Sequence, residues 1–151
     1  MEITVNMAPQ VLSGKIALVT GAGQGNGRAI AKGLAKAGAT VIVTDLVQEN
    51  AQSVAQEILQ SGAKAFAYEL NVTGADECKA LAVIVTKEVG NIDILINNAG
   101  ITQDARLIKM TEAQFDTVID VNLKGVFNCT QLVVPHMLEA GKGAVVNASS
   151  V

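Results

Sequence analysis

A chain of 151 residues is long enough for a single domain that buries most of its core. Half of the residues are apolar and only 17% are charged, so the composition is that of a globular protein, and the net charge of −3 offers no basic surface for nucleic acid or an acidic membrane. No apolar run approaches the roughly 20 residues of a membrane span. We therefore expect a soluble protein that binds neither nucleic acids nor membranes.

The N-terminal segment, residues 1–13, has no basic stretch followed by an apolar one, so we predict no signal peptide. We interpret it as a flexible arm before a single domain over residues 14–151. The two cysteines, Cys78 and Cys129, fall in expected helices and have neither metal-ligand spacing nor a disulfide pattern. We expect them to be small core residues, no metal to be bound, and the reducing cytoplasm to be the location.

The first expected strand, residues 15–20, is a short apolar run that ends in a glycine-rich turn over residues 21–27. A helix follows over residues 26–37, with apolar positions at helical spacing and Gly38 as a left-handed stop. Glycine has no Cβ to block a ligand, and the start of a helix presents unpaired N–H groups and a partial positive charge. The turn therefore predicts a cradle for a diphosphate.

Strands and helices alternate along the rest of the chain. Thr73 with Asp76, and Thr111 with Gln114, are interpreted as capping boxes that open helices. Alternation of this kind implies right-handed crossovers and a three-layer, doubly wound parallel sheet of the Rossmann type, with strand order 3-2-1-4-5. The expected elements after the first helix are a strand over 40–44, a helix over 48–60, a strand over 64–70, a helix over 73–89, a strand over 92–96, a long helix over 111–139 and a strand over 144–148.

Ligands of such sheets bind beyond the carboxyl ends of the strands at the switch point, here between the first and fourth strands. Asp45 ends the second strand, where a carboxylate can accept both hydroxyls of an adenosine ribose and would repel a 2′-phosphate. Gln24 stands where a cation would help to hold that phosphate, and Arg28 lies too far into the helix to do so. We therefore expect NAD in preference to NADP. Arg28 after Gly27 also departs from the Gly-Lys-Ser/Thr ending of nucleoside triphosphate hydrolases.

Four motifs resemble those of the short-chain dehydrogenases/reductases, and together they cover essentially residues 15–151. Within that family, residues 70–73 and 101–104 are most similar to the 3-oxoacyl-carrier-protein reductases. The resemblance implies an NAD(P)-dependent oxidoreductase that transfers a hydride between nicotinamide and a secondary alcohol or ketone. The motifs are Thr20-Gly21-x-x-x-Gly25-x-Gly27, Asn97-Asn98-Ala99-Gly100, Asn122 in Val121-Asn122-Leu123, and the serines Ser149 and Ser150.

The resemblance also implies a role for each residue that matches a family motif. The residues around the diphosphate and nearby ribose are Gly21, Ala22, Gly23, Gln24, Asn26 and Gly27. The adenosine ribose falls to Asp45, the adenine to Asn71 and Val72, and the nicotinamide side to Asn98, Ala99 and Gly100. In catalysis, Asn122 takes part in a proton relay and Ser150 orients the carbonyl, with Ser149 as the less favoured choice.

Family enzymes further require Tyr-x-x-x-Lys about a dozen residues after the serine, beyond Val151. The only tyrosine, Tyr68, lies in the third expected strand and has Val72 four residues on, so it cannot substitute. We expect His136, the only histidine, to be solvated. The chain is thus interpreted as the cofactor-binding part of an enzyme, truncated before the Tyr-x-x-x-Lys segment and inactive alone. The missing helix would leave apolar surface on the fourth and fifth strands, which must be hidden by another chain, by swapping or by aggregation. We expect a homo-oligomer, a dimer or tetramer.

Two alternatives remain open at this stage. A glycine-rich turn after the first strand and an acid after the second also suit an S-adenosylmethionine-dependent methyltransferase, although the Asn97-Asn98-Ala99-Gly100 turn argues against it. The chain can also be a non-catalytic module that binds a dinucleotide. Whether Tyr-x-x-x-Lys follows Val151 in the gene separates this module from the enzyme.

Overall fold

A five-stranded parallel sheet forms the centre of the protein in the computed structural model, which describes residues 10–149. Neighbouring strands pair in parallel in the order β3-β2-β1-β4-β5, so the predicted fold class and strand order are confirmed. Most of the expected N-terminal arm, and Ser150 with Val151, lie outside the described residues. The strands are β1 (Ile16–Val19), β2 (Thr40–Asp45), β3 (Ala65–Glu69), β4 (Ile94–Asn97) and β5 (Ala144–Asn147).

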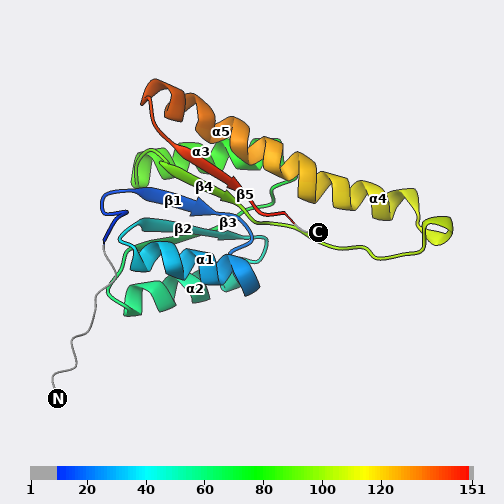
Figure 1. Cartoon of the computed structure of the whole chain (residues 1–151), viewed down its shortest axis with the longest axis horizontal. Helices are drawn as coiled ribbons and strands as arrows, with labels where there is room; N and C mark the ends of the chain where they lie inside the picture. Colours follow the sequence, from blue (N-terminus) through cyan, green and yellow to red (C-terminus); the bar gives the residue numbers. More distant parts are fainter. Residues whose placement is uncertain (1–9, 150–151) are drawn as a thin grey trace, which may run out of the picture.

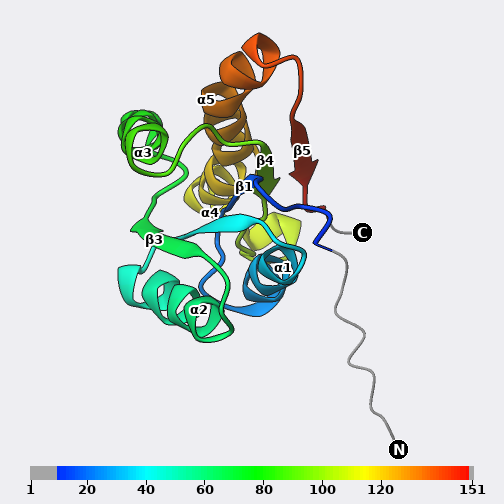
Figure 2. The same ribbon diagram turned by 90° about the vertical axis from the view of Figure 1, so that its left-hand side faces the viewer.

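Helices cover the sheet on both faces. In Figure 1, α1 (Gly25–Lys36) and α2 (Gln48–Gln60) lie below the sheet, and α3 (Ala75–Glu88) and α5 (Gly125–Glu139) lie above it; Figure 2 shows the same two layers from the side. Each layer packs its own apolar cluster against the strands. The bounds of α2 are those predicted, because an apolar face at helical spacing and Gly62 at positive φ define both of its limits.

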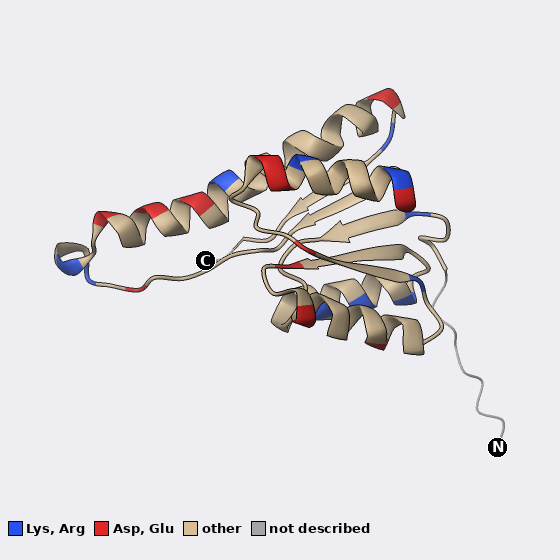
Figure 3. Cartoon of the chain, turned by 180° about the vertical axis from the view of Figure 1, so that it is seen from behind, with Lys and Arg blue, Asp and Glu red and all other residues tan. Residues whose placement is uncertain are grey.

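The strands are apolar because both of their faces are covered. Val41, Ile42 and Val43 of β2 are all fully buried, which is why the sequence shows a continuous apolar run there and no alternation. Figure 3 shows the charged residues on helices and loops and at strand ends. Asp45 and Glu69 are the only charged residues of the five strands, and each is the last residue of its strand. Within the strands themselves, charge thus occurs only at the carboxyl ends of β2 and β3.

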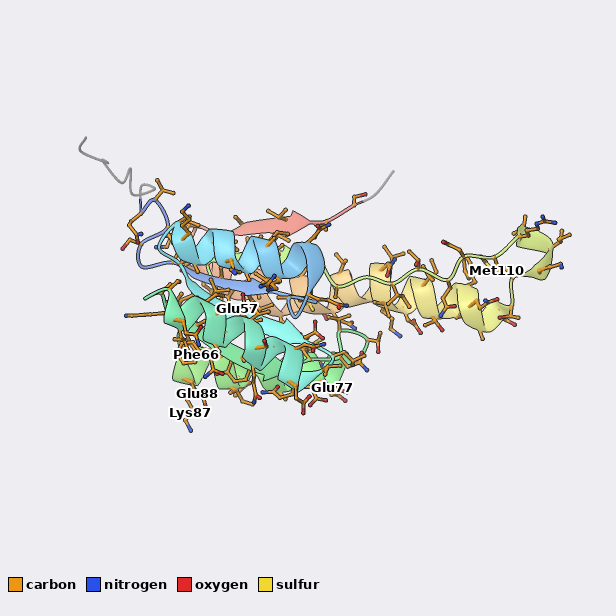
Figure 4. The ribbon with its side chains drawn as sticks, turned by 90° about the horizontal axis from the view of Figure 1, so that it is seen from below. Glu57, Phe66, Glu77, Lys87, Glu88 and Met110 are labelled. Atoms are coloured by element: carbon orange, nitrogen blue, oxygen red, sulfur yellow. The ribbon has the colours of Figure 1, made fainter. Side chains whose placement is uncertain are left out.

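Helices α1 and α2 are joined by an ion-pair cluster around Glu57, which is labelled in Figure 4. Its carboxylate accepts hydrogen bonds from the Arg28 guanidinium at 2.7 Å and from the Lys32 ammonium at 2.8 Å. Hydrogen bonding to Arg28, and then to Lys32, lowers the pKa of Glu57 to about 2. Arg28 is therefore engaged within the helical layer.

The expected long helix is observed as α4 (Glu112–Ile119), a π-helical segment η2 (Asp120–Lys124) and α5, which follow one another without a break. The capping box at its start is confirmed: the Thr111 hydroxyl accepts the Gln114 N–H at 3.2 Å, and the Gln114 side chain accepts the Thr111 N–H at 2.9 Å. In Figure 1, α4 extends beyond the sheet, and Figure 4 places Met110 near the tip of this projection, next to η1 (Leu107–Lys109).

The other predicted capping box, at Thr73, is wrong. Helix α3 begins at Ala75 and has Gly74 as its N-cap, with no side-chain cap. The Thr73 hydroxyl and backbone N–H both donate to the Asn71 side-chain oxygen, at 2.8 and 3.1 Å. Thr73 is thus used in a local turn around the Asn71 side chain, which competes with capping for the same hydroxyl.

Both cysteines are free thiols in the interior, as expected. Cys78 of α3 and Cys129 of α5 are 1% and 4% exposed and belong to the same apolar cluster. Hydrogen bonding to Cys78 and burial raise the pKa of the Cys129 thiol far above its usual range. Within residues 10–149, no helix combines the length and the apolar character needed to cross a membrane.

Candidate functional site

The glycine turn after β1 touches the residues that follow β4. Gly21 has a φ of 59°, and a Cβ on it would lie 2.8 Å from the Ala99 Cα. A Cβ on Gly27, in the first turn of α1, would collide with the Gly21 carbonyl oxygen and lie 2.5 Å from the Asn98 side-chain nitrogen. These two positions therefore require glycine, which lets the loop, the helix start and the β4 end come together.

The Asn98 side chain holds this turn in place. Its amide nitrogen donates to the carbonyl oxygens of Thr20 and Gly21, each at 3.0 Å. The sequence predicted Asn98 beside the nicotinamide; that role stays a prediction, and the observed contacts give its side chain a different task, fixing the shape of the glycine turn.

Thr20 completes the connection, and the sequence argument assigned it no role of its own. Its hydroxyl accepts the backbone N–H groups of Asn98 and Ala99, both at 3.0 Å, and donates to the Ile96 carbonyl at 3.4 Å. Because Thr20 is only 1% exposed, water cannot take the place of its hydroxyl as the acceptor for the Asn98 and Ala99 N–H groups. The sequence signal for this role of Thr20 is a hydroxyl residue directly after an apolar strand.

Replacing Thr20 with valine, which has the same shape, is expected to lower the free energy of unfolding by about 3 kcal/mol, because two partly buried N–H donors lose their acceptor. Urea unfolding measures the loss. Thr44→Val is the matched control, since the equally buried Thr44 hydroxyl makes one bond, to the Val19 carbonyl at 3.0 Å. We expect a loss of about 1 kcal/mol for it. Equal losses in the two variants would contradict the assignment.

Asp45 lies against the glycine turn from the neighbouring strand end. One carboxylate oxygen accepts the Gly23 N–H at 2.9 Å and the other accepts the Val47 N–H at 3.1 Å. A Cβ on Gly23 would lie 2.7 Å from the first of these oxygens. The side chain is half-buried, and Figure 3 shows acidic residues at strand ends of this edge. A fixed negative charge therefore stands beside the turn.

Gln24 and Asn26 are exposed at the start of α1. Gln24 is the N-cap residue, but its side chain caps no N–H group, and the first turn holds no acidic residue. The helix therefore starts with its partial positive charge uncompensated by a carboxylate of its own. Ala22, by contrast, is fully buried and donates its N–H to the Thr44 carbonyl at 2.8 Å, so its side chain faces the core.

The loop after β3 lies beside Asp45, because the Leu70 N–H donates to the Asp45 carbonyl at 2.9 Å. Asn71 is half-buried and Val72 is buried, and both stand at the carboxyl edge of the sheet. The Val72 carbonyl accepts the Asn128 side chain of α5 at 2.9 Å. Sequence reasoning gave Asn128 no role, since a contact 56 residues away leaves no local pattern.

Asn122 lies in η2 and is bound to the strand β4 exit. Its side chain donates to the Ile101 carbonyl at 2.9 Å and accepts the Ile101 N–H at 2.8 Å. A Cβ on Gly100 would approach the Asn122 side-chain oxygen to 3.5 Å. The fold thus brings Asn122 to the Asn98–Gly100 turn, as expected for residues of one site.

The remaining predicted group is at the end of β5. Asn147, the last residue of β5, pairs in register with Asn97, whose amide donates to the Asn147 side chain at 2.9 Å and to Thr130 of α5 at 3.0 Å. Ser149 follows β5 and is exposed, and Ser150 lies outside the described residues.

Tyr68 and His136 stand apart from this edge. The Tyr68 hydroxyl donates to Glu88 of α3 at 2.8 Å, and burial, with this bond, raises the Tyr68 pKa to about 12. It is therefore protonated at neutral pH and cannot act as the base, as its strand position led us to expect. His136 is exposed near the end of α5, as predicted. Residues 10–149 contain no cluster of three or more His, Cys, Asp or Glu side chains able to hold a metal.

The fold and the site define a doubly wound α/β protein with a glycine turn, an acid and an asparagine turn at its switch point. The family model for the short chain dehydrogenases matches residues 15–151. The chain belongs to the short chain dehydrogenase family, and the resemblance noted in the sequence is confirmed. This membership favours an oxidoreductase over a methyltransferase.

Several individual proteins are similar to this chain. The 3-oxoacyl-(acyl-carrier-protein) reductase FabG of Thermotoga maritima is 49% identical over 140 residues, which cover 93% of this chain and 57% of the relative. FabG of Staphylococcus aureus strain Mu50 is 49% identical, with 91% and 56% covered. Nodulation protein G of Azospirillum brasilense is 44% identical, with 93% and 57% covered. This chain therefore spans a little over half the length of these relatives.

A solved structure has the same fold. A crystal structure of a metagenomic short-chain oxidoreductase in complex with NADP superposes with a TM-score of 0.89 and is 36% identical in sequence. The match covers 93% of this chain and 64% of that chain.

Proposed function

We propose that this chain is the cofactor-binding part of an NAD(P)-dependent oxidoreductase that interconverts a secondary alcohol and a ketone. The observation that carries the proposal is the glycine turn, which Asn98 and Thr20 fix to the end of β4 with Asp45 beside it. A diphosphate fits there because the glycines leave the backbone bare and α1 starts without an acidic residue in its first turn. Nicotinamide, when bound, supplies or accepts the hydride.

The chain's own residues then bind and orient the cofactor and substrate. Asp45 accepts the hydroxyls of the adenosine ribose, and Asn71 and Val72 contact the adenine. Asn122 belongs to a proton relay, and Ser150 orients the substrate carbonyl. The residues proposed around the diphosphate and nearby ribose are Gly21, Ala22, Gly23, Gln24, Asn26 and Gly27, and those on the nicotinamide side are Asn98, Ala99 and Gly100.

The substrate class that we propose is a 3-oxoacyl thioester or a similar small ketone. Support comes from the names of the relatives, two of which are 3-oxoacyl-carrier-protein reductases. We also propose that the protein works in the cytoplasm, a reducing compartment in which two buried free thiols persist.

We further propose that the tyrosine and lysine of proton transfer follow Val151 in a longer protein. The coverage of the relatives supports this, because 43% of the length of the Thermotoga maritima protein has no counterpart here. Tyr68, whose pKa is raised by burial and by its hydrogen bond to Glu88, offers no substitute. Without those two residues the chain would bind a dinucleotide and catalyse nothing, which is the alternative function.

Activity of the complete gene product distinguishes the two functions. Mixed with NADH and a 3-oxoacyl thioester, it is expected to oxidise NADH in step with formation of the 3-hydroxyacyl product, measured by NADH absorbance and by mass spectrometry of the thioester. NADH that binds but is not oxidised in the presence of any ketone tested would instead favour the non-catalytic module.

The NAD preference is a finer part of the proposal. Both oxygens of Asp45 are held by backbone N–H groups, which gives the carboxylate a defined position at the end of β2. We expect a 2′-phosphate to lie beside this carboxylate, where the like charge would repel it. The solved structure described above contains NADP, but this bound cofactor is a property of that protein and not of this chain.

Self-association is the last part of the proposal, with a second copy of the chain as the partner. Four apolar side chains recur every fourth residue along α4, η2 and α5, and each is exposed: Phe115, Ile119, Leu123 and Phe127. We call these four residues the apolar stripe. An antiparallel pairing of two chains centred on residue 121 would place Lys124 of one chain between Asp116 and Asp120 of the other, so the charges beside the apolar stripe are self-complementary.

Phe115→Glu in the complete gene product is expected to weaken this association at least a hundredfold, on the order of 3 kcal/mol, because a charge replaces a buried aromatic contact. Light scattering after size exclusion gives the mass. Leu138→Glu is the control, since Leu138 is also exposed on α5 but lies outside the stripe. A monomeric parent protein, or an unchanged mass for Phe115→Glu, would refute the pairing.

A further inference from the structure

The turn after β3 is held from inside the protein by α3, which follows it directly in sequence, and by α5, whose contact lies 56 residues away. The buried Val72 carbonyl accepts the Asn128 side-chain N–H of α5 at 2.9 Å and lies 3.7 Å from the Cys78 sulfur of α3. Asn128 is itself only 6% exposed. A buried amide on a helix that is otherwise apolar on this face makes one specific contact, and that contact is to the turn.

Gly125 brings α5 close enough for this bond. A Cβ on Gly125 would lie 2.6 Å from Val72 Cγ2, so the start of α5 packs directly against the Val72 side chain. Gly125 and Asn128 are three residues apart and therefore lie on the same face of the helix. One face of α5 thus fixes the position of Val72 by two interactions: close packing of Gly125 against the Val72 side chain, and the hydrogen bond from Asn128 to the Val72 carbonyl.

The same turn keeps donor groups available. The Asn71 side-chain oxygen is occupied by the Thr73 N–H and hydroxyl, which leaves its NH₂ group for other partners. Within residues 10–149, neither this NH₂ group nor the Val72 N–H donates a hydrogen bond. Adenine carries ring nitrogens that accept such bonds. The Val72 N–H belongs to the peptide that precedes the one whose carbonyl Asn128 binds, and Asn71 is the residue before it, so the position of both donors follows the position of Val72.

We propose that Asn128 is a positioning residue for adenine: it holds the Val72 carbonyl so that the Asn71–Val72 turn presents its donors to the ring, and Gly125 provides the space for it. The inference rests on the proposed function, because it assumes that a dinucleotide lies at this edge. It makes a separate claim, namely that affinity for the adenosine half of the cofactor is set in part from α5, a helix that does not itself touch that half.

The test compares two fragments of the cofactor in the complete gene product. Adenosine diphosphate ribose carries the adenine, and nicotinamide mononucleotide does not. Asn128→Leu, which keeps the volume and removes the donor, is expected to raise the dissociation constant of adenosine diphosphate ribose about tenfold and to change that of the mononucleotide less than about twofold. Titration calorimetry and ligand-observed NMR measure the two constants.

Gly125→Ala perturbs the same turn without touching the hydrogen bond. Alanine favours a helix more than glycine does, so any loss reflects the collision with Val72. We expect the same selective loss of affinity for adenosine diphosphate ribose. If Asn128→Leu does not fold, Gly125→Ala alone tests whether α5 positions the Asn71–Val72 turn. Met137→Ala, a buried position near the other end of α5, is the control: it should lower the melting temperature and leave the ratio of the two constants unchanged.

The outcomes are separable. Equal losses for both fragments, or no loss, would overturn the positioning role while leaving the proposed function intact. A parent protein that binds neither fragment would overturn the proposed function and the inference together.

Discussion

Gly27→Ala is expected to abolish measurable NADH binding and to lower the free energy of unfolding by about 3 kcal/mol, as overpacking of a closed site does. The added methyl would meet the Gly21 carbonyl oxygen and would lie 2.5 Å from the Asn98 side-chain nitrogen and 2.9 Å from the Ala22 Cα. To relieve these collisions, α1 must move away from the glycine turn, and this movement breaks the two Asn98 hydrogen bonds that shape the turn. Calorimetric titration and urea unfolding of the complete gene product measure both effects.

Gly33→Ala is the matched control on the same helix. A Cβ on Gly33 meets nothing within 4 Å, so this substitution is expected to stabilise the protein by up to about 1 kcal/mol through helix propensity and to leave NADH affinity unchanged. If Gly27→Ala behaved like Gly33→Ala, the close approach of α1, the turn and Asn98 would have no functional meaning.

Asp45→Asn is expected to lower the ratio of NADH to NADPH affinity about a hundredfold, because the amide no longer repels a 2′-phosphate and binds the ribose hydroxyls without a charge. The amide oxygen can still accept the Gly23 N–H, which keeps the contact to the glycine turn, while the Val47 N–H on the far side of the side chain loses its acceptor. Dissociation constants for both cofactors, measured at one ionic strength, give the ratio.

Glu69→Gln removes the same charge from the adjacent strand end. Glu69 pairs in register with Asp45 and is exposed. The ratio should change less than about threefold in this variant, because solvent screens an exposed charge. A ratio that responds equally to both substitutions would show a general charge effect and would refute a specific role for Asp45.

Local patterns in the sequence determined much of the fold. The bounds of α2 were predicted to the residue, and the capping box at Thr111 was found, because an apolar face and a cap are encoded within a few neighbouring residues. The prediction at Thr73 was wrong for the same local reason, since Asn71, two residues earlier, binds its hydroxyl. Propensity alone does not say which of two local bonds forms.

The contacts that shape the site were mostly beyond sequence reasoning. Asn98 and Asp45 were singled out by their places at strand ends, and the structure brings both to the glycine turn. Thr20 and Asn128 were missed because their partners lie more than 50 residues away and have no periodic signature. The π-helical segment that carries Asn122 was also not foreseen, since residues 111–139 show one unbroken helical pattern.

Titration of the isotope-labelled complete gene product with NADH and with NADPH, followed by amide NMR shifts and calorimetry, tests the central claim most directly. The account predicts that NADH binds at least tenfold more tightly than NADPH and that the largest shifts occur at the amides of Gly23, Val72 and Ala99. If neither dinucleotide bound, or if the shifts were confined to other parts of the protein, the proposed dinucleotide site would be contradicted.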